Sequence, residues 1–190
     1  ISYNQPKLCA NASWNSTAIT FATSATVGTS PVGIFVSSNN TVYATDHLVA
    51  GTGTAGATSL TLNSPRGIFI DNNLNLYVAD GGNNRIQKFL SGQLNGTTIP
   101  TGTIVLSWPT AVVLDADGYL FIVDYATSRI IGSGPYGFRC IAACSGQGSQ
   151  SNQLYNPEML SFDSYGNIFV TDYNNNRIQK FLLITSSCSK

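Results

Sequence analysis

The sequence predicts an all-β fold in which small antiparallel sheets recur along the chain, the arrangement of a β-propeller. Three observations predict it. A proline is followed by fourteen residues and then an aspartate in four separate copies. Each copy alternates strand-prone and turn-prone stretches, and few segments show helical periodicity without interruption by Gly, Pro or β-branched residues. A repeat of roughly 40 to 50 residues with three or four strands is the unit of a propeller.

The four copies share one register. Their prolines and aspartates are Pro31 and Asp46, Pro65 and Asp80, Pro109 and Asp124, and Pro157 and Asp172. An aromatic residue stands three positions before each aspartate, at Tyr43, Tyr77, Phe121 and Phe169. In the last three copies an arginine follows the aspartate by five positions, at Arg85, Arg129 and Arg177.

The second copy predicts a three-stranded meander. Strands are expected at Gly67–Ile70, Leu76–Ala79 and Arg85–Leu90, with turns at Asp71–Asn75 and Asp80–Asn84. Branched and aromatic side chains fit a pleated, half-buried surface. Asn, Asp and Gly suit the turns, because Asn and Asp side chains bond the backbone locally and all three accept left-handed conformations.

The first copy departs from the others, since His47–Gly51 stands where an Asn-rich turn and an arginine strand would follow. Its outer strand is therefore expected to be altered or missing. The copies could form a closed four-bladed propeller, or part of a larger or inter-chain one. We expect residues 1–30 to be a strand-prone, glycosylated segment, 31–184 the propeller and 185–190 a tail. Ser16–Ser24 could complete the last blade, or Ala10–Ala25 could extend the sheet edge of a neighbouring chain.

Cysteines and glycosylation sequons predict an extracellular protein. Of the three possible pairings, the proximity of Cys140 and Cys144 in the sequence favours a disulfide between them, which leaves Cys9 to pair with Cys188. A structural zinc site is not expected, because its four ligands usually come as two close pairs and His47 is the sole histidine. Sequons free of proline stand at Asn11, Asn15, Asn39 and Asn95. Disulfides and N-glycans belong to one oxidising compartment, so secretion is expected.

Charge disfavours nucleic acid as a partner. The nine basic and nine acidic residues are scattered and form no phosphate-binding stripe. No apolar run reaches the 18 or more residues of a membrane-spanning helix, so membrane insertion is not expected.

Two stretches carry a resemblance to a known family. The second copy reads SPRGIFIDNNLNLYVADGGNNRIQKF and the fourth NPEMLSFDSYGNIFVTDYNNNRIQKF. This pattern of proline, strand, turn, strand, Asn-rich turn and Arg-Ile-Gln strand resembles the NHL repeat, from about Pro31 to Leu183. The cysteine-bearing ends look like secreted invertebrate NHL proteins. The resemblance implies a propeller, and some similar propellers are enzymes with a histidine-ligated metal or a Glu/Asn/Asp calcium site.

The aspartates ending the second strands have two readings. A ring of carboxylates could bind calcium, but we expect a structural role, in which each aspartate accepts turn amides and pairs with the following arginine. Asp71, Asp115 and Asp163 are expected to be turn residues. The Gly51–Gly56 segment spells G-x-G-x-x-G but opens no helix, so we expect a connection between blades.

The expected function is therefore structural, self-assembling or adhesive, with no enzymatic activity and no cofactor. Partners would be further copies or another extracellular protein or glycan. The alternative is an extracellular binding module for a protein or glycan. A second alternative is a calcium-dependent lactonase or lyase using Glu158, the single glutamate of the chain.

Overall fold

A computed structural model describes residues 33–36, 42–45 and 55–183. Its strands form four antiparallel sheets that follow one another along the chain. The first sheet holds β1 (Gly33–Val36) and β2 (Val42–Thr45). The second holds β3 (Pro65–Ile70), β4 (Leu76–Asp80), β5 (Arg85–Phe89) and β6 (Gly96–Thr98). The third holds β7 (Pro109–Leu114), β8 (Leu120–Asp124), β9 (Arg129–Gly132) and β10 (Arg139–Ala142). The fourth holds β11 (Pro157–Phe162), β12 (Ile168–Asp172) and β13 (Arg177–Phe181).

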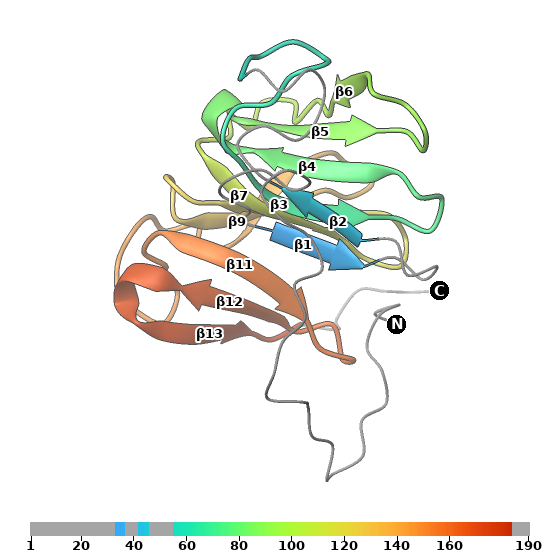
Figure 1. The fold of residues 1–190 in the computed structure, drawn as a ribbon. Coiled ribbons are helices and arrows are strands. Elements are labelled where there is room, and N and C mark those ends of the chain that lie inside the picture. Colours follow the sequence, from blue (N-terminus) through green and yellow to red (C-terminus); the bar gives the residue numbers. More distant parts are fainter. Residues whose placement is uncertain (1–32, 37–41, 46–54, 184–190) are drawn as a thin grey trace, which may run out of the picture.

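Each sheet is a blade, and the first strands of successive blades pack on one another. β1 packs on β3, β3 on β7 and β7 on β11. The blade β7–β10 therefore lies between β3–β6 and β11–β13 (Figure 1). Within the described residues the only helices are two 3-10 turns, η1 (Gly81–Asn83) and η2 (Tyr173–Asn175), each joining the second and third strands of a blade. The predicted all-β fold of propeller blades is confirmed.

The expected three-stranded meander was incomplete. The second and third blades each carry a fourth strand, β6 and β10. β6 has only three residues and no apolar alternation, so its partner β5 defines it rather than its own sequence. In the last blade the described sheet stops at the third strand, β13.

Apolar side chains between blades make the core. The layer between the second and third blades includes Ala79 and Ile86 from one side and Val112, Ile122 and Ile131 from the other. A matching layer joins the third and fourth blades. Complete burial of one aliphatic side chain of this size contributes about 1.5–3 kcal/mol, so these layers hold the blades together.

One glycine sets how closely two blades approach. A Cβ atom at Gly67, in β3, would lie 2.6 Å from the carbonyl oxygen of Thr110 and 2.9 Å from the Cα atom of Ala111, both in β7. These are backbone atoms of a strand, which cannot move away from an added Cβ atom as the end of a flexible side chain can. The β3–β7 contact therefore requires a residue without a side chain at this position.

Aspartates organise the turns between first and second strands. In the last blade, the Asp163 Oδ1 atom accepts the backbone amides of Tyr165 and Asn167, and Oδ2 accepts the Asn167 side-chain amide. That side-chain hydrogen bond is the largest influence that lowers the pKa of Asp163 to about 2. In the second blade, burial acts to raise the pKa of the equivalent Asp71. The hydrogen bonds that Asp71 accepts outweigh burial, so its pKa is lowered.

Several expectations fall outside the described residues. These are the first-copy residues Pro31, Asp46 and His47, the sequons at Asn11, Asn15 and Asn39, and Cys9 and Cys188. The structure does contain the Cys140–Cys144 disulfide, which closes the loop after β10. No helix among the described residues has the length and apolar character needed to span a bilayer.

Candidate functional site

The recurring aspartates lie at the centre of a hydrogen-bonded clasp in each of the last three blades. In the second blade the fully buried Asp80 carboxylate accepts the Asn63 backbone amide at 2.7 Å and the Arg85 Nε–H at 2.7 Å. Asp124 pairs in the same way with Ser107 and Arg129, and Asp172 with Tyr155 and Arg177. The clasp ties the end of the second strand to the connector that enters the same blade.

The arginines extend the clasp to connector carbonyls. The Arg85 guanidinium also donates to the carbonyl oxygens of Ala57, Thr58 and Thr61. Arg177 reaches three matching carbonyls, whereas Arg129 has one, that of Val105. Each carboxylate thus accepts three donors from its own repeat and is fully buried. This is the geometry of a structural ion pair.

A second contact joins each blade to the next. Asn84 and Ser128, which follow the second-to-third-strand turn, both adopt positive φ. The Asn84 Oδ1 atom accepts the backbone amide of Trp108 at 2.7 Å, and the Ser128 Oγ atom accepts that of Asn156 at 3.1 Å. Trp108 and Asn156 are the residues directly before Pro109 and Pro157. Each contact therefore receives the X-Pro turn that opens the next blade.

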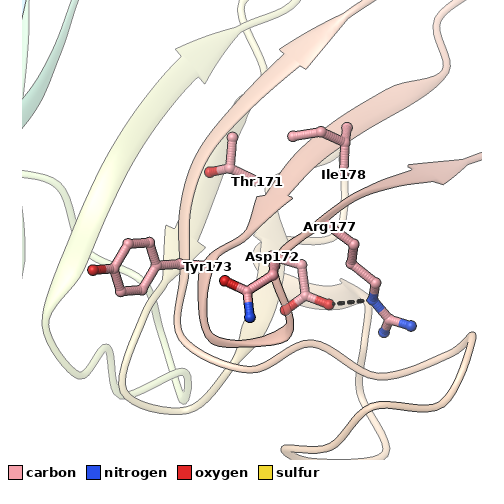
Figure 2. A pocket seen from close by; sticks show the side chains of 6 residues that line it. Thr171, Asp172, Tyr173, Arg177 and Ile178 are labelled. Carbon is pink, nitrogen blue, oxygen red and sulfur yellow. Dashed lines mark hydrogen bonds and ion pairs between the residues drawn. The ribbon is translucent and has the colours of Figure 1, made fainter.

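In the last blade the matching position is open. Asn176 has the same left-handed conformation, with φ 51°, and its side chain forms no hydrogen bond within the described part of the chain. Around it lies an open depression of about 430 Å³, lined by Thr171, Asp172, Tyr173, Asn176, Arg177 and Ile178. We call these six residues the last-blade face. Figure 2 shows Thr171 and Ile178, which are cross-strand partners, beside the Asp172–Arg177 ion pair.

A comparison of two strands of identical sequence shows that the last-blade face lacks a following blade among the described residues. β5 and β13 both read RIQKF. Ile86 of β5 is fully buried against the third blade, whereas its counterpart Ile178 in β13 is 62% exposed. The difference lies in the neighbour and not in the strand. The last-blade face is the surface that interior blades bury against a following blade.

The edge of β13 is open as well. β5 pairs on its outer side with β6, while β13 is the outermost strand of the described last sheet. Leu182 and Leu183, directly after β13, are 70% and 56% exposed. Within residues 33–36, 42–45 and 55–183, the last blade therefore has both a face without a following blade and an outer strand edge without a partner strand.

Metal ions require sets of ligand side chains that lie close together. The described residues contain no group of three or more His, Cys, Asp or Glu side chains placed to hold a metal ion. Burial raises the pKa of Glu158, and the positive charge of Arg66 opposes that rise. Asp115 and Asp163 lie in first-to-second-strand turns, like Asp71, and bond their own turn amides.

Other predicted residues lie where expected. Asn95 is exposed on the loop before β6, and Pro65, Pro109 and Pro157 each begin the first strand of a blade. Gly56 lies in the connector that leads to β3. Residues 51–54 are outside the described ranges.

Sequence reasoning missed two features of the blade junctions. One is the left-handed residue that accepts the X-Pro amide, and the other is the buried leucine three positions before each proline, at Leu62, Leu106 and Leu154. The recurring L-x-x-P spacing could have identified the leucines. Nothing in the local sequence distinguishes Asn84 from the asparagines beside it.

The NHL repeat family matches residues 62–89 and 154–181 of the chain. These are the second and fourth copies, including their clasps. The search of curated proteins found no match.

Solved propellers share the fold. The chain is 16% identical to a catalytically inactive virginiamycin B lyase from Staphylococcus aureus, with quinupristin, over 83% of this chain and 57% of that one, with a TM-score of 0.55. For a streptogramin B lyase the identity is 16%, the coverage 80% and 54%, and the TM-score 0.51. For the extracellular domain of BT4673, a one-component system of B. thetaiotaomicron, these values are 16%, 80% and 23%, and 0.59. The chain thus spans little more than half of either lyase, and at this identity the likeness shows the fold alone.

Proposed function

We propose that this chain is a secreted, non-enzymatic glycoprotein whose propeller associates head to tail with further copies through the last-blade face. The partner surface is the first blade of the next copy, which contains β1 and β2. Head-to-tail contacts generate rings when the rotation closes and filaments when it does not. The role is structural, as a building unit outside the cell.

One observation carries the proposal. The last-blade face is exposed, although the equivalent faces of the second and third blades are buried by the blade that follows. Ile178 stands where Ile86 and Ile130 are fully buried, and Asn176 stands where Asn84 and Ser128 accept an X-Pro amide. A surface already shaped for a following blade needs only a second such blade to be covered.

The sequence of the last blade adds support. β13 repeats the RIQKF of the interior strand β5. The last blade therefore has the composition of an interior blade.

The test is the oligomeric state of the purified full chain. We expect a mass by light scattering that rises with concentration, and rings or fibres by electron microscopy. Ile178→Lys places a charge in the contact and should leave monomers, while Val105→Lys, at an 80% exposed site on another loop, should not. A wild-type chain that stays monomeric at high concentration would refute the proposal.

A binding role is the second candidate, favoured by exposed aromatic side chains at one end of the blades. Tyr136 and Tyr165 are 96% and 80% exposed, on the β9–β10 and β11–β12 loops. In a meander these loops lie at the same end, and exposed tyrosines offer an apolar ring with a polar tip to a protein or glycan. Loss of a glycan-array or cell-surface signal in Tyr136→Ala and Tyr165→Ala variants would favour this role.

The non-enzymatic part of the proposal has its own test. A calcium-dependent lactonase or lyase would need Glu158 as a ligand or base. Lactone hydrolysis that requires calcium and disappears in Glu158→Gln would overturn it. We expect no such activity.

A further inference from the structure

We infer that an N-glycan on Asn95 covers a patch of exposed leucines beside β6, the outermost strand of the second blade, and keeps that patch from binding other proteins. The inference rests on the glycosylation that the proposed function includes. It does not depend on the head-to-tail contact, because the patch lies on a different blade from the last-blade face.

Four leucines with exposed side chains surround the start of β6. The exposed fractions are 41% for Leu60, 39% for Leu74, 57% for Leu90 and 72% for Leu94. We call these four residues the leucine patch. A contiguous exposed apolar patch on a folded domain marks a surface that another group covers.

Hydrogen bonds bring two of these leucines to the β5–β6 loop. The Gln93 amide donates to the Leu90 carbonyl oxygen at 2.9 Å and closes a tight turn. The Ser91 amide, in that turn, donates to the Asn75 side chain at 3.2 Å. Leu74, the residue before Asn75, therefore lies beside the same loop.

Asn95 stands among the leucines. Leu94 directly precedes it, and the amide of Gly96, directly after it, donates to the Ser59 carbonyl oxygen at 2.8 Å. The connector that carries Leu60 therefore runs beside β6 (Figure 1). The Asn95 side chain is exposed and forms no hydrogen bond within the described residues. A sugar attached to it would start between the connector and the β5–β6 loop.

No charged side chain belongs to the leucine patch. Residues 55–65 and 90–114 contain no Asp, Glu, Lys or Arg. Lys88, in β5, places its Nζ atom 5.1 Å from the centroid of the Tyr77 ring, which packs toward the third blade. The Asp71 carboxylate accepts the backbone amides of its own turn. A glycan would give this uncharged surface a hydrated exterior.

The equivalent loop of the third blade has the opposite composition. The β9–β10 loop joins the same pair of strands and ends at Arg139, whose side chain is exposed. That loop contains Tyr136 but no leucine and no sequon. The sequon therefore occurs in the loop that has leucines and lacks a charge.

The sequon is placed to carry such a cover. Asn95 and Thr97, which supply its amide and its hydroxyl, are both exposed. Pyranose rings present C–H groups on their faces and hydroxyl groups at their edges. The first sugars can therefore lie on the leucine methyl groups while their hydroxyl groups stay in water.

A matched pair of variants at one position tests the cover. Thr97→Ala destroys the sequon and keeps Asn95, whereas Thr97→Ser keeps the sequon. Both are made in the full chain with Ile178→Lys, which removes the contact of the last-blade face, and are expressed through a eukaryotic secretory pathway. The intact mass should show one glycan fewer in Thr97→Ala than in Thr97→Ser.

Loss of the glycan should expose the leucine patch. We expect Thr97→Ala to bind roughly threefold more of the apolar dye ANS than Thr97→Ser, because the dye reports exposed apolar surface. Its mass by light scattering should also rise with concentration. Circular dichroism and the Tm of each variant check that the fold is intact.

Removal of leucines assigns the effect to this surface. Leu90→Ser together with Leu94→Ser, added to Thr97→Ala, should return dye binding and mass to the values of Thr97→Ser. Dye binding and mass that stay high in this variant would overturn the inference, because another surface would then be responsible. Equal values in Thr97→Ala and Thr97→Ser, with the glycan lost only from Thr97→Ala, would also overturn it.

The outcomes separate this inference from the proposed function. If glycans are found at other sequons but not at Asn95, only the inference fails. If the wild-type chain does not associate, the head-to-tail contact fails, and the comparison of Thr97→Ala with Thr97→Ser still decides the inference.

Discussion

Removing one clasp carboxylate should be among the most destabilising single changes in the chain. Asp80→Ala deletes a fully buried side chain that accepts three donors: the Asn63 amide, the Asn83 side-chain amide and the Arg85 guanidinium. The Arg85 side chain is only 14% exposed, so water can replace little of the lost interaction. Breaking a buried ion pair by removing one partner costs about 3–5 kcal/mol.

The three blades provide an internal scale for this prediction. The Arg129 side chain is 26% exposed and donates to one connector carbonyl, whereas Arg85 donates to three. Asp124→Ala should therefore cost less than Asp80→Ala. The double variant Asp80→Ala with Arg85→Met should be more stable than the sum of the single effects, by about 0.5–3 kcal/mol, because the two residues share one network.

Urea unfolding followed by circular dichroism measures these free energies. The slope with denaturant should stay constant within the series, so that midpoints report stability. An Asp80→Ala variant within about 0.5 kcal/mol of the wild type, the range of an ordinary surface substitution, would refute the clasp as a main stabilising element. A larger loss for Asp124→Ala than for Asp80→Ala would refute the graded explanation.

Three further predictions test other features. Gly67→Ala should destabilise by about 1–3 kcal/mol through overpacking against β7, whereas Gly134→Ala, whose Cβ would meet only an arginine side chain at 3.6 Å, should change the urea midpoint little. The pKa of Asp163 is about 2, lower than in the unfolded chain, so its contribution to stability is present above about pH 4 and is lost as the pH falls through about 2. Asn167→Ala should raise the NMR titration midpoint of Asp163, and an unchanged midpoint would contradict the assigned cause. For the chain expressed through a eukaryotic secretory pathway, digestion with an N-glycosidase should lower the mass by one glycan more in the wild type than in Asn95→Gln, and equal losses would show an unoccupied site.

Much of the fold could be predicted because comparing the four copies shows which positions recur. The aspartate and the arginine recur at fixed spacing since both are members of the clasp, and the proline recurs because it begins the first strand of each blade. A strand, a turn and a second strand between Pro65 and Asp80 follow from residue preference alone. The fourth strands could not be predicted in this way, because the three residues of β6 owe their conformation to pairing with β5.

The candidate site was harder to predict for a physical reason. β5 and β13 have the same five residues, yet one Ile is buried and the other exposed. Local sequence determines which side chains point to a face, but not whether another blade covers it. Asn84 and Asn176 share a left-handed conformation. They differ because the Asn84 side chain accepts the Trp108 amide of the following blade.

The clasp has a consequence for how such a chain can change its length. Asp80 and Arg85 bond residues 57–63, within the same repeat, and Asp172 and Arg177 bond residues 149–155. Each repeat thus contains its own clasp. Apolar packing and a few hydrogen bonds, such as those of Asn84 to Trp108 and of Thr110 to Pro157, connect it to the next repeat. A gene segment encoding one connector and its blade is therefore a portable cassette. Tandem duplication or loss of such a cassette would leave every clasp intact, so the size of the array can vary without any compensating substitution.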